Sequence, residues 1–147
     1  MEANEKQKAS VGGVKKYTGS CHCGAVRFEA DVDLGNGAIR CNCTICTKTA
    51  WFGALVKPNA FALLSGEENL SSYEWASKTS RRYFCKHCSV NCFARGYLEQ
   101  VGGDYVSLNV NCFDEVELQD LKVAHWDGRH NNWEAGPRPA PWPIFAP

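Results

Sequence analysis

The sequence predicts a single, mostly β domain with few or no helices. The chain has 147 residues, which is the usual size of one domain. Short apolar or alternating segments recur along it at regular spacing, separated by Gly and Pro, as is typical of all-β folds. No long segment carries the 3.6-residue periodicity of an amphipathic helix. About 44% of the residues are apolar, which is enough to build a core.

The expected strands are separated by turn signals such as the Gly-containing turn at 34–37. The clearest alternation of apolar and polar residues lies at 25–30 and 105–110, as expected for half-buried strands. The full set of expected strands is 25–30, 52–56, 61–64, 70–75, 81–84, 92–98 and 105–110. The section 113–127 is open between a helical turn and a further strand.

Residues 1–15 are polar and are expected to form a disordered lead-in. The first ordered element is expected near Tyr17, and residues 16–135 form the β domain.

Residues 136–147 hold five of the six prolines and are expected to form an extended tail. Its Trp142, Ile144 and Phe145 are costly to leave in water. The tail is therefore expected to dock on its own body, which is favoured, or on a partner.

The charge balance disfavours a nucleic-acid-binding protein. The formal net charge is +0, with 16 basic and 16 acidic residues, whereas phosphate binding needs a basic excess. No secretory signal and no segment long enough to span a bilayer is seen, so no membrane partner is expected. The nine cysteines are closely clustered, which favours metal ligands over disulfides and a reducing compartment, most simply the cytoplasm.

Three thiols lie within six positions at Cys41, Cys43 and Cys46. Such a group suits one metal ion and leaves the fourth tetrahedral position free, as in catalytic zinc sites. Two further half-sites, at Cys21/Cys23 and Cys85/Cys88, can close one four-cysteine site that joins the start of the domain to its middle. The alternative, that all seven are buried thiols, is disfavoured by the spacing.

The two other cysteines, Cys92 and Cys112, are interpreted as buried free thiols, with a redox-sensitive Cys112 as the alternative.

At this point the sequence resembles the glutathione-dependent formaldehyde-activating enzyme family, which also includes centromere protein V. Three stretches carry the resemblance, and together they place most of the chain, roughly 17–126, in the family pattern. They are Gly19-Ser20-Cys21-His22-Cys23-Gly24-Ala25-Val26-Arg27-Phe28, Cys41-Asn42-Cys43-Thr44-Ile45-Cys46 and Phe84-Cys85-Lys86-His87-Cys88. The departures are Asn42 and Thr47, where the family often has His and a basic residue, and Ser89, where it usually has Gly.

The resemblance implies a small zinc-stabilised β-tent of short antiparallel sheets with two zinc ions per chain. One zinc would be structural, and the other would be catalytic and leave one position open. The implied ligands are Cys21, Cys23, Cys85 and Cys88 for the first, and Cys41, Cys43 and Cys46 for the second. The implied activity is that of a carbon–sulfur lyase that forms or breaks S-hydroxymethylglutathione or a related glutathione adduct. The expected partner is this small thiol adduct, and a homo-oligomer is possible.

A metal at the three-thiol group would turn a bound thiol into a nucleophile or polarise an aldehyde, and the residues do not separate the two roles. Nearby cations would offset the negative charge of three thiolates and bind the carboxylates of a glutathione-like substrate. The candidates are Lys48, Arg81, Arg82 and Arg95, although any single one is more often an ordinary solvated residue.

Trp51 and Phe52 either line the pocket or pack in the core.

His22 and His87 are interpreted as exposed residues outside the ligand set. His125 and His130 are candidates for an acid/base group or a fourth ligand, but neither function is favoured for them.

Two other function classes compete with the lyase. One is a non-catalytic zinc domain that acts as a binding module, which the centromere relative suggests and the neutral charge disfavours. The other is a redox protein that uses Cys85 and Cys88, and it lacks the βαβ context of a thioredoxin-like motif.

Overall fold

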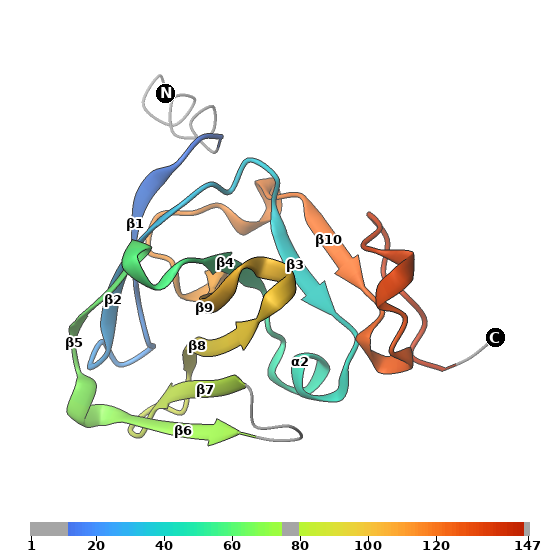
Figure 1. Ribbon diagram of the computed structural model, residues 1–147. Coiled ribbons are helices and arrows are strands. Elements are labelled where there is room, and N and C mark those ends of the chain that lie inside the picture. Colours follow the sequence, from blue (N-terminus) through green and yellow to red (C-terminus); the bar gives the residue numbers. More distant parts are fainter. Residues whose placement is uncertain (1–11, 75–79, 146–147) are drawn as a thin grey trace.

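The computed structural model describes residues 12–74 and 80–145 (Figure 1). Within these two ranges, ten strands form two sheets, in the orders β1-β2-β5 and β10-β3-β4-β9-β8-β7-β6. The strands are β1 Lys15–Ser20, β2 Arg27–Val32, β3 Ala38–Cys41, β4 Gly53–Val56, β5 Phe61–Ser65, β6 Leu70–Glu74, β7 Ser80–Cys85, β8 Asn91–Leu98, β9 Gly103–Asn109 and β10 Val123–Trp126. The prediction of a mostly β fold is confirmed.

The helical elements are short. The single α-helix among the described residues is α2, Thr44–Thr49. The 3-10 turns are η1 Pro58–Ala60, η2 Glu67–Asn69, η3 Glu99–Val101, η4 Val110–Cys112, η5 Leu118–Asp120, η6 Gly128–His130 and η7 Trp133–Ala135. None of the helices in the described ranges is long and apolar enough to cross a membrane.

Most of the expected strands lie within a few residues of where the pattern predicted them. The open section 113–127 holds both alternatives, because the turn η5 precedes β10. The expected lead-in lies mostly outside the described residues, as do position 75 of one expected strand and the last two residues of the tail.

One pairing departs from the antiparallel expectation. β10 joins the edge of the larger sheet in parallel with β3, so that Trp126 lies opposite Cys41 and His125 opposite Arg40. All other strand pairs are antiparallel. The parallel pair brings the C-terminal part of the chain to the strand that ends in the first cysteine of the three-thiol group.

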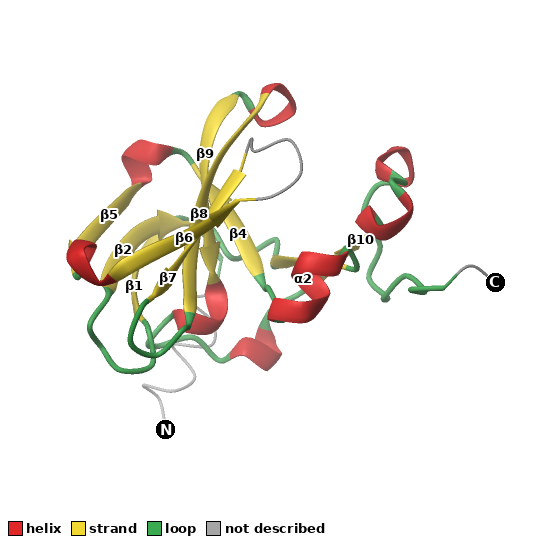
Figure 2. Ribbon diagram, turned by 90° about the horizontal axis from the view of Figure 1, so that it is seen from below, coloured by secondary structure: helices red, strands yellow, loops and turns green. Residues whose placement is uncertain are grey.

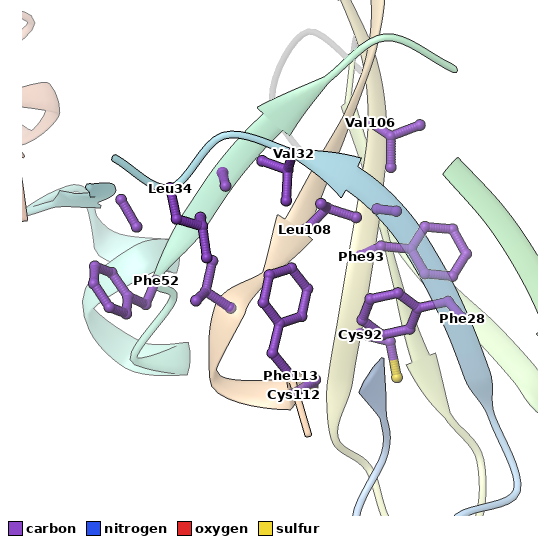
Figure 3. Close-up of a cluster of buried hydrophobic side chains, with 14 of the residues drawn as sticks. Phe28, Val32, Leu34, Phe52, Cys92, Phe93, Val106, Leu108, Cys112 and Phe113 are labelled. Carbon is purple, nitrogen blue, oxygen red and sulfur yellow. The ribbon is translucent and has the colours of Figure 1, made fainter. Parts of the chain in front are cut away.

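The core fills the space where the smaller sheet faces the larger one (Figure 3). From β2, Phe28 and Val32 point inward at alternate positions, and their exposures are 0% and 5%. From the larger sheet, Phe93 and Leu108 meet them and are almost fully buried. The ring of Phe61 bridges the layers, with its centroid 4.7 Å from that of Phe93. Alternating burial of this kind fixes strand register, because a one-residue slip would expose the apolar face.

Both ribbon views place α2 and the segment after β10 at the side of the molecule away from β5 (Figures 1 and 2). The tail docks on this side, as expected. Arg138 and His125 exchange two backbone hydrogen bonds, of 2.8 and 3.0 Å, and the Trp142 indole donates to the carbonyl of His125 at 2.8 Å. The docking is partial, because Phe145 is 86% exposed.

Candidate metal centres

Four cysteines come together at one end of the smaller sheet. Cys21 and Cys23 follow β1, Cys85 ends β7 and Cys88 lies in the turn after it. Their four sulfurs all lie within 4.8 Å of one another. The Cys21–Cys23 and Cys23–Cys85 sulfur pairs are each 3.7 Å apart. Four sulfurs at about 2.3 Å from one zinc ion would stand about 3.8 Å apart, so this group can hold one metal ion.

The backbone around this group favours thiolates. The N–H of Val26 donates to the sulfur of Cys21 at 3.3 Å, and that of His87 to Cys85 at 3.4 Å. Burial opposes ionisation of Cys88, but backbone N–H groups of Cys23 and Val90 outweigh it and lower the pKa of Cys88 to about 6. These donors favour the thiolate that a metal ligand needs at Cys88, whereas at Cys23 the backbone hydrogen bond of Ala25 is outweighed by burial and by hydrogen bonds with neighbouring thiols, which raise the pKa to about 11.

The second knuckle closes with a residue in the left-handed region. Ser89 has φ +64° and donates its backbone N–H to the carbonyl of Cys85 at 2.8 Å. Gly adopts this conformation without the steric penalty that a Cβ brings. The departure from the usual family residue at this position therefore strains the turn without removing a ligand.

The three-thiol group spans the end of a strand and the start of a short helix. Cys41 ends β3, Cys43 is the N-cap residue of α2, and Cys46 lies in its first turn. Cys43 and Cys46 are three positions apart on a helix, and such a spacing puts both side chains on one face. Among the described residues, the four-cysteine group is the only set of three or more ligand side chains within 4.8 Å, so these three sulfurs are less tightly gathered.

The three thiols nevertheless interact with one another. Hydrogen bonds with Cys41 and Cys46 hold the pKa of Cys43 far below its usual range. Hydrogen bonds with Cys41 and Cys43 raise the pKa of Cys46, and the bond with Cys43 raises that of Cys41. The group therefore carries its first negative charge on Cys43, and a metal ion would have to displace the protons of the other two.

Of the four candidate cations, the structure brings Arg82 to the three-thiol group. Its Nη2 donates to the sulfur of Cys46 at 3.1 Å, and its Nη1 donates to Thr49 Oγ1 at 3.2 Å. The guanidinium also lies over the ring of Trp51, 4.2 Å from the ring centroid.

The other three candidates lie elsewhere. Lys48 is exposed on α2, Arg81 pairs with Glu74 at 3.1 Å, and Arg95 lies over Phe61 and Phe93.

The two aromatic residues after α2 are both buried, with exposures of 6% for Trp51 and 1% for Phe52. Phe52 belongs to the core and carries the Arg40 guanidinium over its ring, whereas Trp51 packs on Arg82 beside the thiols. Trp51 therefore lines the site, and Phe52 packs in the core.

A segment far along the chain covers the other side of the three-thiol group. Asp127 accepts a 2.7 Å hydrogen bond from the side-chain amide of Asn42. The backbone N–H of Arg129 donates to Asn42 Oδ1 at 2.9 Å. Gly128 lies directly on the thiols, because a Cβ added there would meet the sulfur of Cys41 at 2.5 Å. Asp127, Gly128 and Arg129 were not singled out by the sequence, although Asn42 was marked as unusual.

The histidines divide as follows. His22 and His87 are exposed, and His87 contacts Asn69 rather than a metal site. His130 Nδ1 lies 2.7 Å from Asp127 Oδ1, at the edge of the covering segment. His125 lies in β10 beside the tail.

Cys92 and Cys112 are buried free thiols, as expected. Their hydrogen bond raises the pKa of Cys92 and lowers that of Cys112.

The architecture is therefore that of a small two-sheet β protein with a four-cysteine group that can hold one metal ion and a second, separate group of three thiols. Residues 16–128 match the family model of the glutathione-dependent formaldehyde-activating enzyme. The chain belongs to this family.

One curated relative carries the name of this family, and one solved structure has a similar fold. A protein of Halomonas elongata that is named as a glutathione-dependent formaldehyde-activating enzyme is 37% identical over 79 residues, which are 48% of this chain and 50% of the relative. The match thus spans about half the length of this curated relative. The crystal structure of a Rhodobacter sphaeroides protein superposes with a TM-score of 0.64 and 27% identity, covering 74% of this chain and 98% of that one.

Proposed function

We propose that this protein is a zinc-dependent carbon–sulfur lyase that acts on a small thiol–aldehyde adduct, with S-hydroxymethylglutathione as the first candidate. Family membership supports glutathione and formaldehyde as the chemistry. The observation that carries the proposal is the group of three interacting thiols with a buried guanidinium against one of them.

The reaction needs no oxidant or reductant. In the forming direction, the thiol S–H bond breaks, the sulfur attacks the aldehyde carbon, and a carbon–sulfur bond forms. The electron pair of the carbonyl π bond moves to the oxygen, which takes up one proton and becomes a hydroxyl. In the reverse direction, the hydroxyl loses its proton, the carbonyl re-forms and the carbon–sulfur bond breaks, and the sulfur leaves with the electron pair and takes up one proton.

We assign different roles to the residues of the two centres. Cys21, Cys23, Cys85 and Cys88 would hold a structural zinc that ties the start of the domain to β7. Cys41, Cys43 and Cys46 would hold a second ion with one position open. That ion would supply thiol activation or carbonyl polarisation.

On the protein side, two elements would shape the second centre. The segment 127–129 lies on Cys41 and keeps water from that side. Trp51 and Arg82 flank Cys46, which leaves the adduct to approach between these two boundaries.

The direct test is two-dimensional exchange NMR with glutathione and ¹³C-formaldehyde. The wild-type protein should accelerate interconversion of formaldehyde and its adduct over buffer. Cys46→Ser should lose the acceleration and retain the four-cysteine metal, whereas Cys112→Ala, at a buried thiol outside both groups, should keep the acceleration. A wild-type protein that matches buffer would remove the formaldehyde assignment and favour the binding module.

A further inference from the structure

Arg82 is a buried cation in a protein whose other arginines lie mostly at the surface. It projects from β7 and is 7% exposed. Charged side chains are rarely buried unless they are paired, because removing a charge from water is costly. A buried arginine therefore needs polar or charged partners, and Arg82 has contacts with Cys46, Thr49 and Trp51.

The guanidinium has at least three contacts at or beside the three-thiol group. One terminal nitrogen donates to the sulfur of Cys46 at 3.1 Å, and the other to the Thr49 hydroxyl at 3.2 Å. The flat face packs on Trp51. The two terminal nitrogens thus point to different protein atoms, and two of the five N–H donors are used in holding the guanidinium beside Cys46.

The chemistry of the thiol group explains why a cation belongs there. Three thiolates on one divalent ion leave a net charge of about −1, which weakens the ion as a Lewis acid. One neighbouring guanidinium brings that net charge to about zero. Its hydrogen bond to Cys46 also draws electron density away from the sulfur, and partners of this kind fix a metal ligand's orientation and tune the metal.

We propose that Arg82 is the charge-compensating residue of the Cys41, Cys43 and Cys46 centre, and that it acts through the sulfur of Cys46. The inference rests on the second metal centre of the proposed function. It extends that function by giving Arg82 a role at the sulfur of Cys46. Arg82 is thus a positioning residue that sets the electronic properties of the centre.

Cobalt(II) substitution gives a readout that a merely structural residue would not move. Arg82→Lys keeps the charge but loses the fork, and Arg82→Met keeps the length but loses the charge. Arg81→Met is the matched control, because Arg81 is the next residue on the same strand and pairs with Glu74 at the surface. The measurements are the cobalt stoichiometry, the energy of the sulfur-to-cobalt charge-transfer band, and zinc affinity by chelator competition.

We expect two cobalt ions per chain in the wild type and in Arg81→Met, with identical spectra. Arg82→Met should shift the charge-transfer band of the second ion and weaken its zinc binding by about 10- to 100-fold, while the four-cysteine ion stays bound. Arg82→Lys should lie between the two. If Arg82→Met does not fold, the partly conservative Thr49→Val, which removes the Nη1 acceptor, should shift the same band in the same direction.

Unchanged spectra and zinc affinity in the Arg82 and Thr49 variants would overturn the inference. A wild-type protein that binds a single cobalt ion would overturn it together with the proposed function. Two cobalt ions with the expected band shift, but no exchange of the formaldehyde adduct, would remove the proposed reaction and support the role of Arg82.

Discussion

The side-chain amide of Asn42 donates a 2.7 Å hydrogen bond to the carboxylate of Asp127, 85 positions later in the chain. Asn42 lies between two of the three clustered thiols, and Asp127 follows directly after β10. The same carboxylate accepts from Asn132 at 3.3 Å and contacts His130 at 2.7 Å. The Asp127 carboxylate therefore contacts both Asn42, which lies within the three-thiol group, and two residues that follow the covering segment 127–129.

Asp127→Asn should loosen this cover. The new amide offers one acceptor atom where the carboxylate offers two, so at least one of its donors would lose its partner. We expect a lower melting temperature and weaker metal binding at the three-thiol group, read by calorimetry and by zinc content after dialysis. Asp104→Asn, at an exposed site on β9, is the control. Equal zinc retention in the two variants would contradict the role of Asp127.

Gly128→Ala should remove the second metal without unfolding the domain. The added methyl group would meet the Cys41 sulfur at 2.5 Å and the Trp133 ring at 2.7 Å, so the covering segment must move. We expect zinc content by mass spectrometry to fall from two ions per chain to one. Gly12→Ala is the matched control, because a Cβ there meets nothing within 4 Å. Two zinc ions retained in Gly128→Ala would show that this close approach does not matter.

Cys88→Ser should cost both an ion and much of the stability. The four-cysteine ligands come from distant parts of the chain, so metal binding there contributes folding free energy. We expect the loss of one zinc and a melting temperature lower by about 10 °C or more. Cys92→Ser would add a polar group to the core, so the milder Cys92→Ala serves as the control and should keep both ions. A folded Cys88→Ser protein with two zinc ions would rule out this ligand set.

Ser89→Gly should stabilise the protein. A non-glycine residue in the left-handed region costs roughly 1–2 kcal/mol, and the extra chain entropy of Gly takes back about 0.5–1 kcal/mol. The net gain should be about 0.5–1 kcal/mol, measured by chemical denaturation. Ser72→Gly, in the middle of β6, should have the opposite sign because its backbone is extended. A destabilised Ser89→Gly protein would mean that the strain is relieved elsewhere.

His125 should make the stability fall in mild acid. Burial, followed by the positive charges of Arg40 and Arg138, lowers the pKa of His125 in the folded protein. The unfolded chain takes up this proton near pH 6.5 and the folded chain only at lower pH, so stability is lost as pH falls below about 6.5. His125→Gln cannot titrate there, and its melting temperature should fall less between about pH 6.5 and 5. Parallel curves for both proteins would refute this assignment.

Local patterns in the sequence predicted most of the strands, but they did not predict which strands pair with one another. The alternation of apolar and polar residues predicted the strand β2, because its inward-facing residues, such as Phe28 and Val32, pack in the core. The helix α2 was missed because a six-residue element is too short to show helical periodicity. The parallel pairing of β10 with β3 joins residues about 85 positions apart, and no local signal encodes it.

The candidate site was also predicted only in part from the sequence. Ligand spacing was enough to group Cys21 and Cys23 with Cys85 and Cys88, because zinc knuckles have characteristic intervals. Spacing does not report burial, so it left Arg82 as one of four equal candidates. Its place beside Cys46 depends on how β7 packs on α2, which is a tertiary property.

The link between Asn42 and Asp127 also has a consequence for biosynthesis. A ribosome adds roughly 5–20 residues per second, so the 85 positions between these residues take roughly 4–17 s to make. During that interval the nascent chain presents Cys41, Cys43 and Cys46 without their cover, open to oxidants and to whichever metal ion arrives first. For the second metal centre that we propose, the identity of the ion would therefore be open to kinetic control by the cell's free-metal pool during translation.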